Sequence, residues 1–259
     1  MQDDSIPSQM GEDGFIWWLG KVEDVENDPL KIGRVKVRIF NFHNTDKSKV
    51  STDLLPWAHI SQNPTSAAHD KIGNAPVGIL VGSMAWGFFL DGTHAQQPVV
   101  VGTFQGIPGG KSDLTPLATG TNTVKNAGSP DEPKSPYAAK YPHNKVTTTT
   151  SGHVIEVDDT SGAERIRIYH KSGSYDETGP DGTKVDKSVK NRYIIVDKDM
   201  TVHVVGNAKI TVDGNTTGHF NGTVTADIKG ATKVTAHATV DVTASSTITV
   251  TAPNVVIKA

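Results

Sequence analysis

The last quarter of the chain alternates apolar and polar residues within a repeat of eight. From Val202 onward the even-numbered positions are Val, Ile, Ala, Gly, Thr, Phe or Ser until Asn254, whereas every charged residue and histidine there is odd-numbered. The repeat is marked by residues eight apart, which are Gly206, Gly214, Gly222, Gly230, Ala238, Ser246 and Asn254. This period of two predicts extended strands with one small apolar face and one hydrated face.

One octad of strand is too short to enclose a core by itself. A single-chain solenoid would need about three octads per coil and would have only about two coils, fewer than the three repeats that such folds require. Three copies wound around one axis would pair each other's strand edges and bury the even-numbered row. The residues expected to face this axis are Val204, Gly206, Val212, Gly214, Phe220, Gly222, Ile228, Gly230, Ala236, Val242 and Ile248. Residues 201–259 are therefore predicted to form an intertwined, homotrimeric β-helix.

Ordinary globular patterning is confined to residues 15–107, which follow a polar tail at residues 1–14. Apolar runs typical of strands cover residues 15–22, 33–40, 55–60, 80–90 and 98–104. Five short strands separated by turns within roughly 100 residues predict a small OB-type barrel. We therefore expect an all-β chain that begins with an OB-fold domain.

The middle of the chain is more polar. Residues 108–150 are rich in Pro, Gly, Ser and Thr, which predicts a linker that buries no core. Apolar alternation returns in residues 151–200, which we interpret as the region that leads into the β-helix. Within it we expect a hairpin around Thr160–Gly162 and a polar loop at residues 175–191.

Candidate chemistry is sparse. Acidic residues and histidines gather around the expected hairpin, and they are His153, Glu156, Asp158, Asp159 and His170. Because Glu156 and Asp158 alternate with apolar neighbours along one strand, we expect them to face solvent and to serve a surface role. The histidines at 203, 219 and 237 are odd-numbered and would point away from the axis. The sequence thus predicts no catalytic, cofactor or metal site.

Composition fits a soluble, extended β protein. The 259-residue chain has no cysteine, a net charge of -3 and no apolar run approaching the roughly 20 residues that span a bilayer. The polar, acidic start does not resemble a signal peptide, so assembly in the cytoplasm is expected. The barrel has only one modest basic cluster, which lies beside acidic residues and argues against nucleic acid as a partner; it consists of Lys21, Lys31, Arg34, Lys36 and Arg38. The barrel aromatics, Trp17, Trp18, Trp57, Trp86, Phe88 and Phe89, are expected to serve core packing and protein docking.

Several motifs in consecutive order resemble one family. Residues 18–24, 28–38, 55–57, 64–68 and 100–104 resemble the OB domain of the central spike protein in T-even-type contractile phage baseplates. Residues 151–160, 164–166 and 170–173 resemble the start of the trimeric β-helix in that protein and in valine-glycine-repeat spikes of type VI secretion. The resemblance implies a virion baseplate protein that docks on a trimeric hub and punctures the host outer membrane.

One departure from the family bears on activity. The T-even spike carries a lysozyme domain between its OB domain and its β-helix, where this chain has only the predicted linker at residues 108–150. A glycosidase needs two carboxylates at a defined separation on a folded scaffold. The acidic residues available, Asp113, Asp131 and Glu132, lie in a Pro- and Gly-rich stretch. We therefore predict a spike that is not an enzyme.

The alternation of apolar and polar residues in the octads stops at the end of the chain. Val255, Val256 and Ile257 are apolar on both faces, as a docking surface would require. The resemblance implies that a PAAR-type tip protein caps this end. Two other interpretations stay open: the spike of a type VI or extracellular contractile injection system, and an OB-fold module that binds nucleic acid or carbohydrate on a fibrous stalk.

Overall fold

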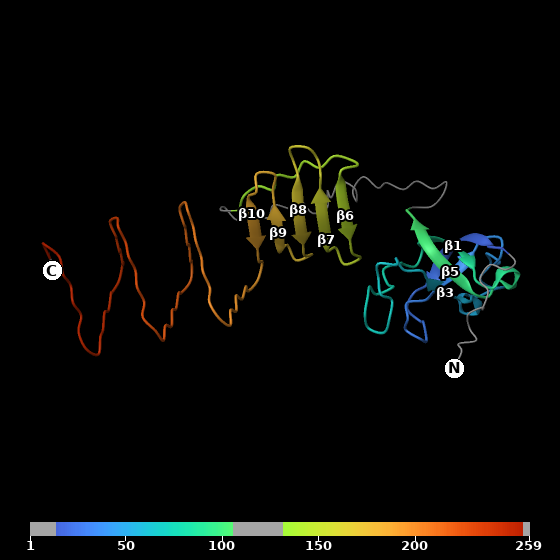
Figure 1. Ribbon diagram of the computed structural model, residues 1–259, viewed down its shortest axis with the longest axis horizontal. Helices are drawn as coiled ribbons and strands as arrows, with labels where there is room; N and C mark the ends of the chain where they lie inside the picture. The colour runs from blue at the N-terminus through green and yellow to red at the C-terminus, as the bar shows by residue number, and fades with distance from the viewer. Residues whose placement is uncertain (1–13, 106–131, 256–259) are drawn as a thin grey trace. The chain divides into compact units, whose positions relative to one another are not determined.

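The computed structural model describes residues 14–105 and 132–255 (Figure 1). Regular structure in these ranges consists of β-strands and two short 3-10 turns, η1 (Thr52–Leu54) and η2 (Gly92–His94), so the predicted all-β class is confirmed. Among the described residues, no helix has the length and hydropathy needed to cross a membrane. The chain divides into one unit that ends at Tyr193 and a second that begins at Ile194.

The first part of the chain forms a closed, five-stranded barrel. Its strands are β1 (Trp17–Asp24), β2 (Val35–Ile39), β3 (Trp57–Ile60), β4 (Met84–Phe89) and β5 (Pro98–Phe104). They follow the order β1-β2-β3-β5-β4, β4 pairs back with β1, and only the β3–β5 pair is parallel. The five predicted strands are confirmed. The fourth begins later than predicted, because the chain turns at Gly82, whose φ is +96°.

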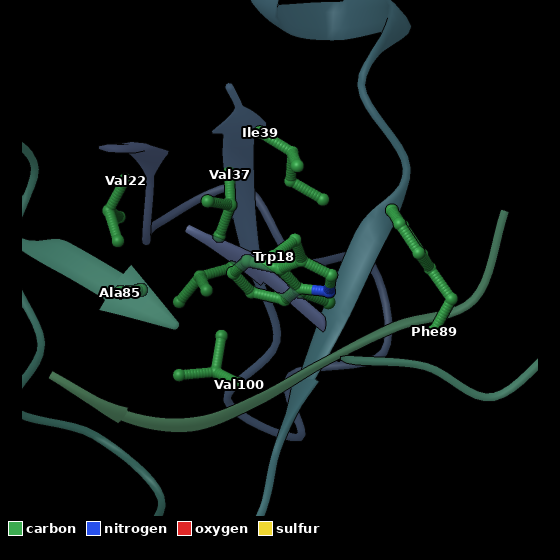
Figure 2. Packing of buried hydrophobic residues seen from close by; sticks show 9 residues of the cluster. Trp18, Val22, Val37, Ile39, Ala85, Phe89 and Val100 are labelled. Atoms are coloured by element: carbon green, nitrogen blue, oxygen red, sulfur yellow. The ribbon is translucent and has the colours of Figure 1, made fainter. Parts of the chain in front are cut away.

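Inward-facing residues of the five strands fill the barrel (Figure 2). Trp18 lies at the centre among Val22, Val37, Ala85 and Val100, all of which are buried. On β1 the buried positions alternate with exposed or half-exposed ones, as the period of two requires. A glycine is needed at position 87 because the backbones of β4 and β5 lie close together there. A Cβ atom on Gly87 would lie 1.7 Å from the Val99 carbonyl oxygen.

Two buried ion pairs support the barrel wall. Asp28 accepts hydrogen bonds from the Arg34 guanidinium at 2.7 and 3.0 Å, and Arg38 donates to Glu23 at 2.8 and 2.9 Å. The hydrogen bonds from Arg38 lower the pKa of Glu23 from 4.5 to about 2. Burial raises the pKa of Asp28, but hydrogen bonds from Arg34 and three backbone N–H groups outweigh it and lower that pKa to about 2.

These low pKa values predict that acid destabilises the barrel. Both carboxylates have folded-state pKa values below their usual ones, so their contribution is present above about pH 4.5 and is lost as the pH falls towards 2. We expect the barrel's unfolding temperature, followed by tryptophan fluorescence, to fall over this interval. Asp28→Asn should lower stability at pH 7 and weaken the pH dependence. An equally steep acid transition in that variant would contradict the assignment.

A second sheet lies further along the chain. It consists of β6 (Asn144–Thr148), β7 (Val154–Asp158), β8 (Arg165–Tyr169), β9 (Tyr175–Thr178) and β10 (Lys184–Lys187). The strands form an antiparallel meander in chain order, and the predicted β7–β8 hairpin is present.

Two sequence expectations for this region were wrong. The predicted polar loop at 175–191 contains β9 and β10, and the predicted linker overlaps β6. These strands were missed because they carry polar residues on both faces, so their alternation does not separate apolar from polar positions.

Candidate functional site

Residues 194–255 bend at intervals of eight residues. The bends fall at 197–198, 205–206, 213–214, 221–222, 229–230, 237–238 and 245–246. Figure 1 shows the chain running back and forth between them. Each octad thus comprises six extended residues and a two-residue bend, and the bends coincide with Gly206, Gly214, Gly222 and Gly230. The repeat seen in the sequence is therefore also a repeat of the backbone.

The octad chain forms no strand pairs among the residues that the structure describes. None of its extended segments pairs with another as a strand, and every side chain from 194 to 255 is exposed. Ile210 is 90% exposed and Phe220 70%. An apolar row of this length cannot be buried by one chain running back and forth, because the row faces nothing but solvent. Whether the even-numbered or the odd-numbered row of side chains faces a partner stays a prediction.

The second sheet presents a similar open surface, which we call the apolar face. It is made by Ile155, Val157, Ile166 and Ile168, which are exposed although they lie on the central strands. The strand register places Ile155 opposite Ile168 and Val157 opposite Ile166. Four β-branched side chains therefore form one contiguous apolar square on β7 and β8.

The charged residues of the same strands lie on the other side of the sheet, which we call the ionic face. Its buried members are Glu156, Asp158, Arg165, Arg167 and Glu177. Glu156 and Asp158 are 0% and 2% exposed, so the expectation that they face solvent was wrong. The predicted alternation is correct, but the covered side is the charged one.

The ionic face is held together by ion pairs between adjacent strands. Arg165 contacts both Glu156 and Glu177, and its Nη1 lies 2.9 Å from the Glu177 carboxylate. Arg167 Nη1 lies 3.0 Å from the same carboxylate, and its guanidinium stacks 4.3 Å from the Tyr175 ring centroid. Arg165, Arg167 and the two glutamates thus each have an opposite charge in contact, as buried charges require. Asp158 instead accepts a hydrogen bond from the Thr160 backbone N–H at 2.9 Å.

Residues 132–143, which we call the covering segment, lie over this ionic face. Ser135 donates to Glu177 at 2.9 Å, and the Tyr137 ring stacks over Arg165 at 4.9 Å. Glu132 accepts a hydrogen bond from the Tyr175 hydroxyl at 2.7 Å, and burial together with this carboxylate raises the pKa of Tyr175 to about 12. Part of the predicted linker is therefore packed against the sheet.

Of the remaining candidate residues, the structure brings two histidines together. The His153 and His170 rings come together at 4.4 Å, but Glu156 and Asp158 are buried in the ionic face. Nowhere in the described ranges do three or more His, Cys, Asp or Glu side chains form a group that could hold a metal ion. Of the acidic linker residues, Glu132 belongs to the covering segment, whereas Asp113 and Asp131 lie outside the described residues.

Three basic residues of the barrel have partners within the barrel. Arg34 and Lys36 stack on Trp57 at 5.7 and 4.8 Å, and Arg38 pairs with Glu23. Their charges are therefore partly offset by contacts inside the domain. At the far end of the chain Val255 is exposed, whereas Val256 and Ile257, also predicted to bind the tip protein, lie outside the described residues.

Comparison with known proteins agrees with this architecture. The family described as the Gp5 N-terminal OB domain matches residues 41–127. Protein Gp5 of Vibrio phage KVP40 is 34% identical over 80% of this chain. The chain is thus similar to phage Gp5 proteins. The pre-baseplate central spike protein Gp5 of enterobacteria phage T4 is 42% identical over 32% of the chain.

The two matches differ in extent. The chain spans 65% of the length of the KVP40 Gp5 protein, and the T4 match covers 15% of the T4 Gp5 protein. The KVP40 alignment covers most of this chain, so it extends well beyond the length of the barrel. The recognised resemblance to baseplate central spikes is therefore confirmed by the Gp5 relatives.

Proposed function

We propose that three copies of this chain form the central spike of a contractile phage tail baseplate. The proposal is carried by one observation: the apolar face of the second sheet and the octad chain that follows it are both exposed in a single copy. Two further copies would cover both surfaces with the same kind of residue. The T4 relative is a pre-baseplate central spike protein, which supports the placement in the virion.

In the proposed mechanism the chain transmits force and catalyses no reaction. The barrel docks on a trimeric hub protein, and the β-helix, capped by a PAAR-type tip protein near Val255, punctures the host outer membrane when the tail contracts. Intertwined strands suit this task because every backbone N–H and C=O of the rod would be paired with a neighbouring copy. In addition, the ionic face and the covering segment leave the apolar face free to meet the axis.

A phage particle is favoured over the other contractile machines. Both Gp5 relatives are phage proteins, and the Gp5 N-terminal OB domain matches the first part of this chain. The stalk-bound nucleic-acid module is less favoured, because Arg34, Lys36 and Arg38 are engaged inside the barrel.

The proposal predicts a trimer of unusual stability. Light scattering of the purified chain should give a mass three times the 27.6 kDa of one copy. The trimeric rod should resist detergent and heat better than the barrel, because its apolar rows are buried among three chains while the barrel relies on its own core. A monomer at micromolar concentration would exclude both the trimeric rod and the piercing function.

A second prediction concerns catalysis. If the chain is a spike without the lysozyme domain, it should not hydrolyse peptidoglycan at any pH from acid to neutral. The measurement is release of reducing sugar from purified cell walls, with heat-denatured protein as the control. Release above that control would show that the chain carries a muralytic site after all.

A further inference from the structure

Five aromatic rings form a continuous row on the outer side of the barrel, which we call the aromatic surface. The rings belong to Phe15, Trp17, Phe88, Trp86 and Phe104. Adjacent ring centroids lie 5.1 to 6.3 Å apart, so each ring touches the next. Trp17 is 57% exposed and Phe104 51%. Large aromatic side chains left in water as one group mark an interaction surface.

The aromatic surface borders a strand edge to which no other strand of the described residues is paired. On one side β5 pairs with β4 as far as Phe104. On the other side β3 reaches only Val100, and Ser61 N donates the last hydrogen bond, to the Val100 carbonyl oxygen at 2.8 Å. Beyond Val100 this edge of β5 pairs with no other strand of residues 14–105 or 132–255. Such an edge is a template for a further strand.

A groove of about 280 Å³ runs beside this open edge. Val101–Thr103 of β5 line it on one side, and the loop at Asn74–Val77 lines it on the other. The loop wall is fixed, because Asn74 N donates to Ser66 Oγ at 2.9 Å and Ser66 Oγ donates to Gln62 Oε1 at 2.8 Å. All lining residues are uncharged, which selects for an uncharged occupant.

The aromatic surface reaches the groove through Trp86. This ring lies across Gly102 on β5, where a Cβ atom would come within 2.6 Å of the indole nitrogen. Gly102 therefore allows the indole to extend towards the open edge. A strand added at this edge would place alternate side chains beside Trp86 and Phe104, because successive side chains point to opposite faces.

Two features of this region restrict its occupant. The uncharged lining favours an uncharged segment, and the exposed aromatic rings favour apolar side chains. Nucleic acid is disfavoured because no Lys or Arg lines the groove.

We propose that an extended, uncharged segment of a second baseplate protein adds to the open edge of β5 as a further strand and packs apolar side chains on the aromatic surface. This inference rests on the proposed spike function, and it names the part of the barrel that docks. The backbone of β5 would provide affinity, and the Trp86 and Phe104 rings would select apolar residues at alternate positions.

Hydrogen exchange tests the proposal on the whole chain. The backbone amides of residues 101–104 should exchange much faster in the free trimer than in purified tails, by at least about 100-fold. The amides of η1, which lies outside the groove and the aromatic surface, should not change. Equal exchange of residues 101–104 in both states would overturn the docking site.

Matched substitutions and cross-linking complete the test. Val101→Lys places a charge at the edge and should lower incorporation into tails at least 10-fold, whereas Leu54→Lys, at an exposed apolar residue of η1, should not. A photo-cross-linker at position 101 should join this chain to a second protein. Cross-links only between copies of this chain would overturn the proposal. A chain that is monomeric or missing from tails would instead refute the spike function itself.

Discussion

Replacing Ala236 by aspartate is expected to abolish assembly of the trimer. Ala236 belongs to the row predicted to face the axis, so one substitution would bring three carboxylates together where three chains meet. Each would lose its hydration and repel the other two, at a cost of several kcal/mol per buried charge. Light scattering of the purified variant should therefore give monomers or misassembled species.

Two further variants distinguish the effect of the row in which a residue lies from the effect of its charge. Thr235→Asp lies in the row predicted to face water and should change stability by less than about 0.5 kcal/mol. Ala236→Asn has almost the size of aspartate without its charge, so it should impair assembly less. If Thr235→Asp is the disruptive variant, the assignment is wrong by one residue and every inward and outward position in the octads changes places.

The octads illustrate what a sequence can predict about such a chain. The eight-residue spacing of Gly206, Gly214, Gly222 and Gly230 matches the spacing of the backbone bends, because glycine tolerates the close contacts and conformations of a turn. The barrel strands were likewise predictable, since each has a buried row that stands out against its neighbours. Local patterning was sufficient for both.

The second sheet shows where such patterning is insufficient. Alternation of Glu156 with Ile155 and Val157 is correct, yet alternation alone does not say which face is covered. Burial of the charged face depends on partners from β8 and β9 and on the covering segment, whose Ser135 is distant in the sequence from Glu177. A signal was present in the opposite charges of Glu156 and Arg167, which the register places directly opposite each other.

The second sheet exposes its apolar face and buries its ionic face, which is unusual for a sheet in a monomeric protein. A monomeric sheet would be expected to hide Ile155 and Ile166 and to leave Glu156 in water. The observed arrangement is the reverse, and the proposed trimer would account for it because further copies would cover the exposed apolar face. Recognition between copies would then begin at the second sheet, directly before the octads.

Arg165→Met is expected to destabilise the second sheet strongly. The Arg165 side chain is fully buried, and its guanidinium contacts both Glu156 and Glu177. Methionine retains much of the volume but leaves these two carboxylates buried without that cation. Breaking a buried ion pair in this way costs about 3–5 kcal/mol. Hydrogen exchange of the β7 and β8 amides should accelerate, and the unfolding temperature of this region should fall.

A surface pair provides the matched control. Lys145 and Asp159 are joined at 2.6 Å, but their side chains are 74% and 56% exposed. Lys145→Met should therefore cost less than about 1 kcal/mol. Adding Glu156→Leu to Arg165→Met should restore part of the loss, because burying two apolar side chains avoids desolvating a lone charge. If Arg165→Met proves as mild as Lys145→Met, the ionic face does not stabilise the sheet, and the charged side is not the side that is covered.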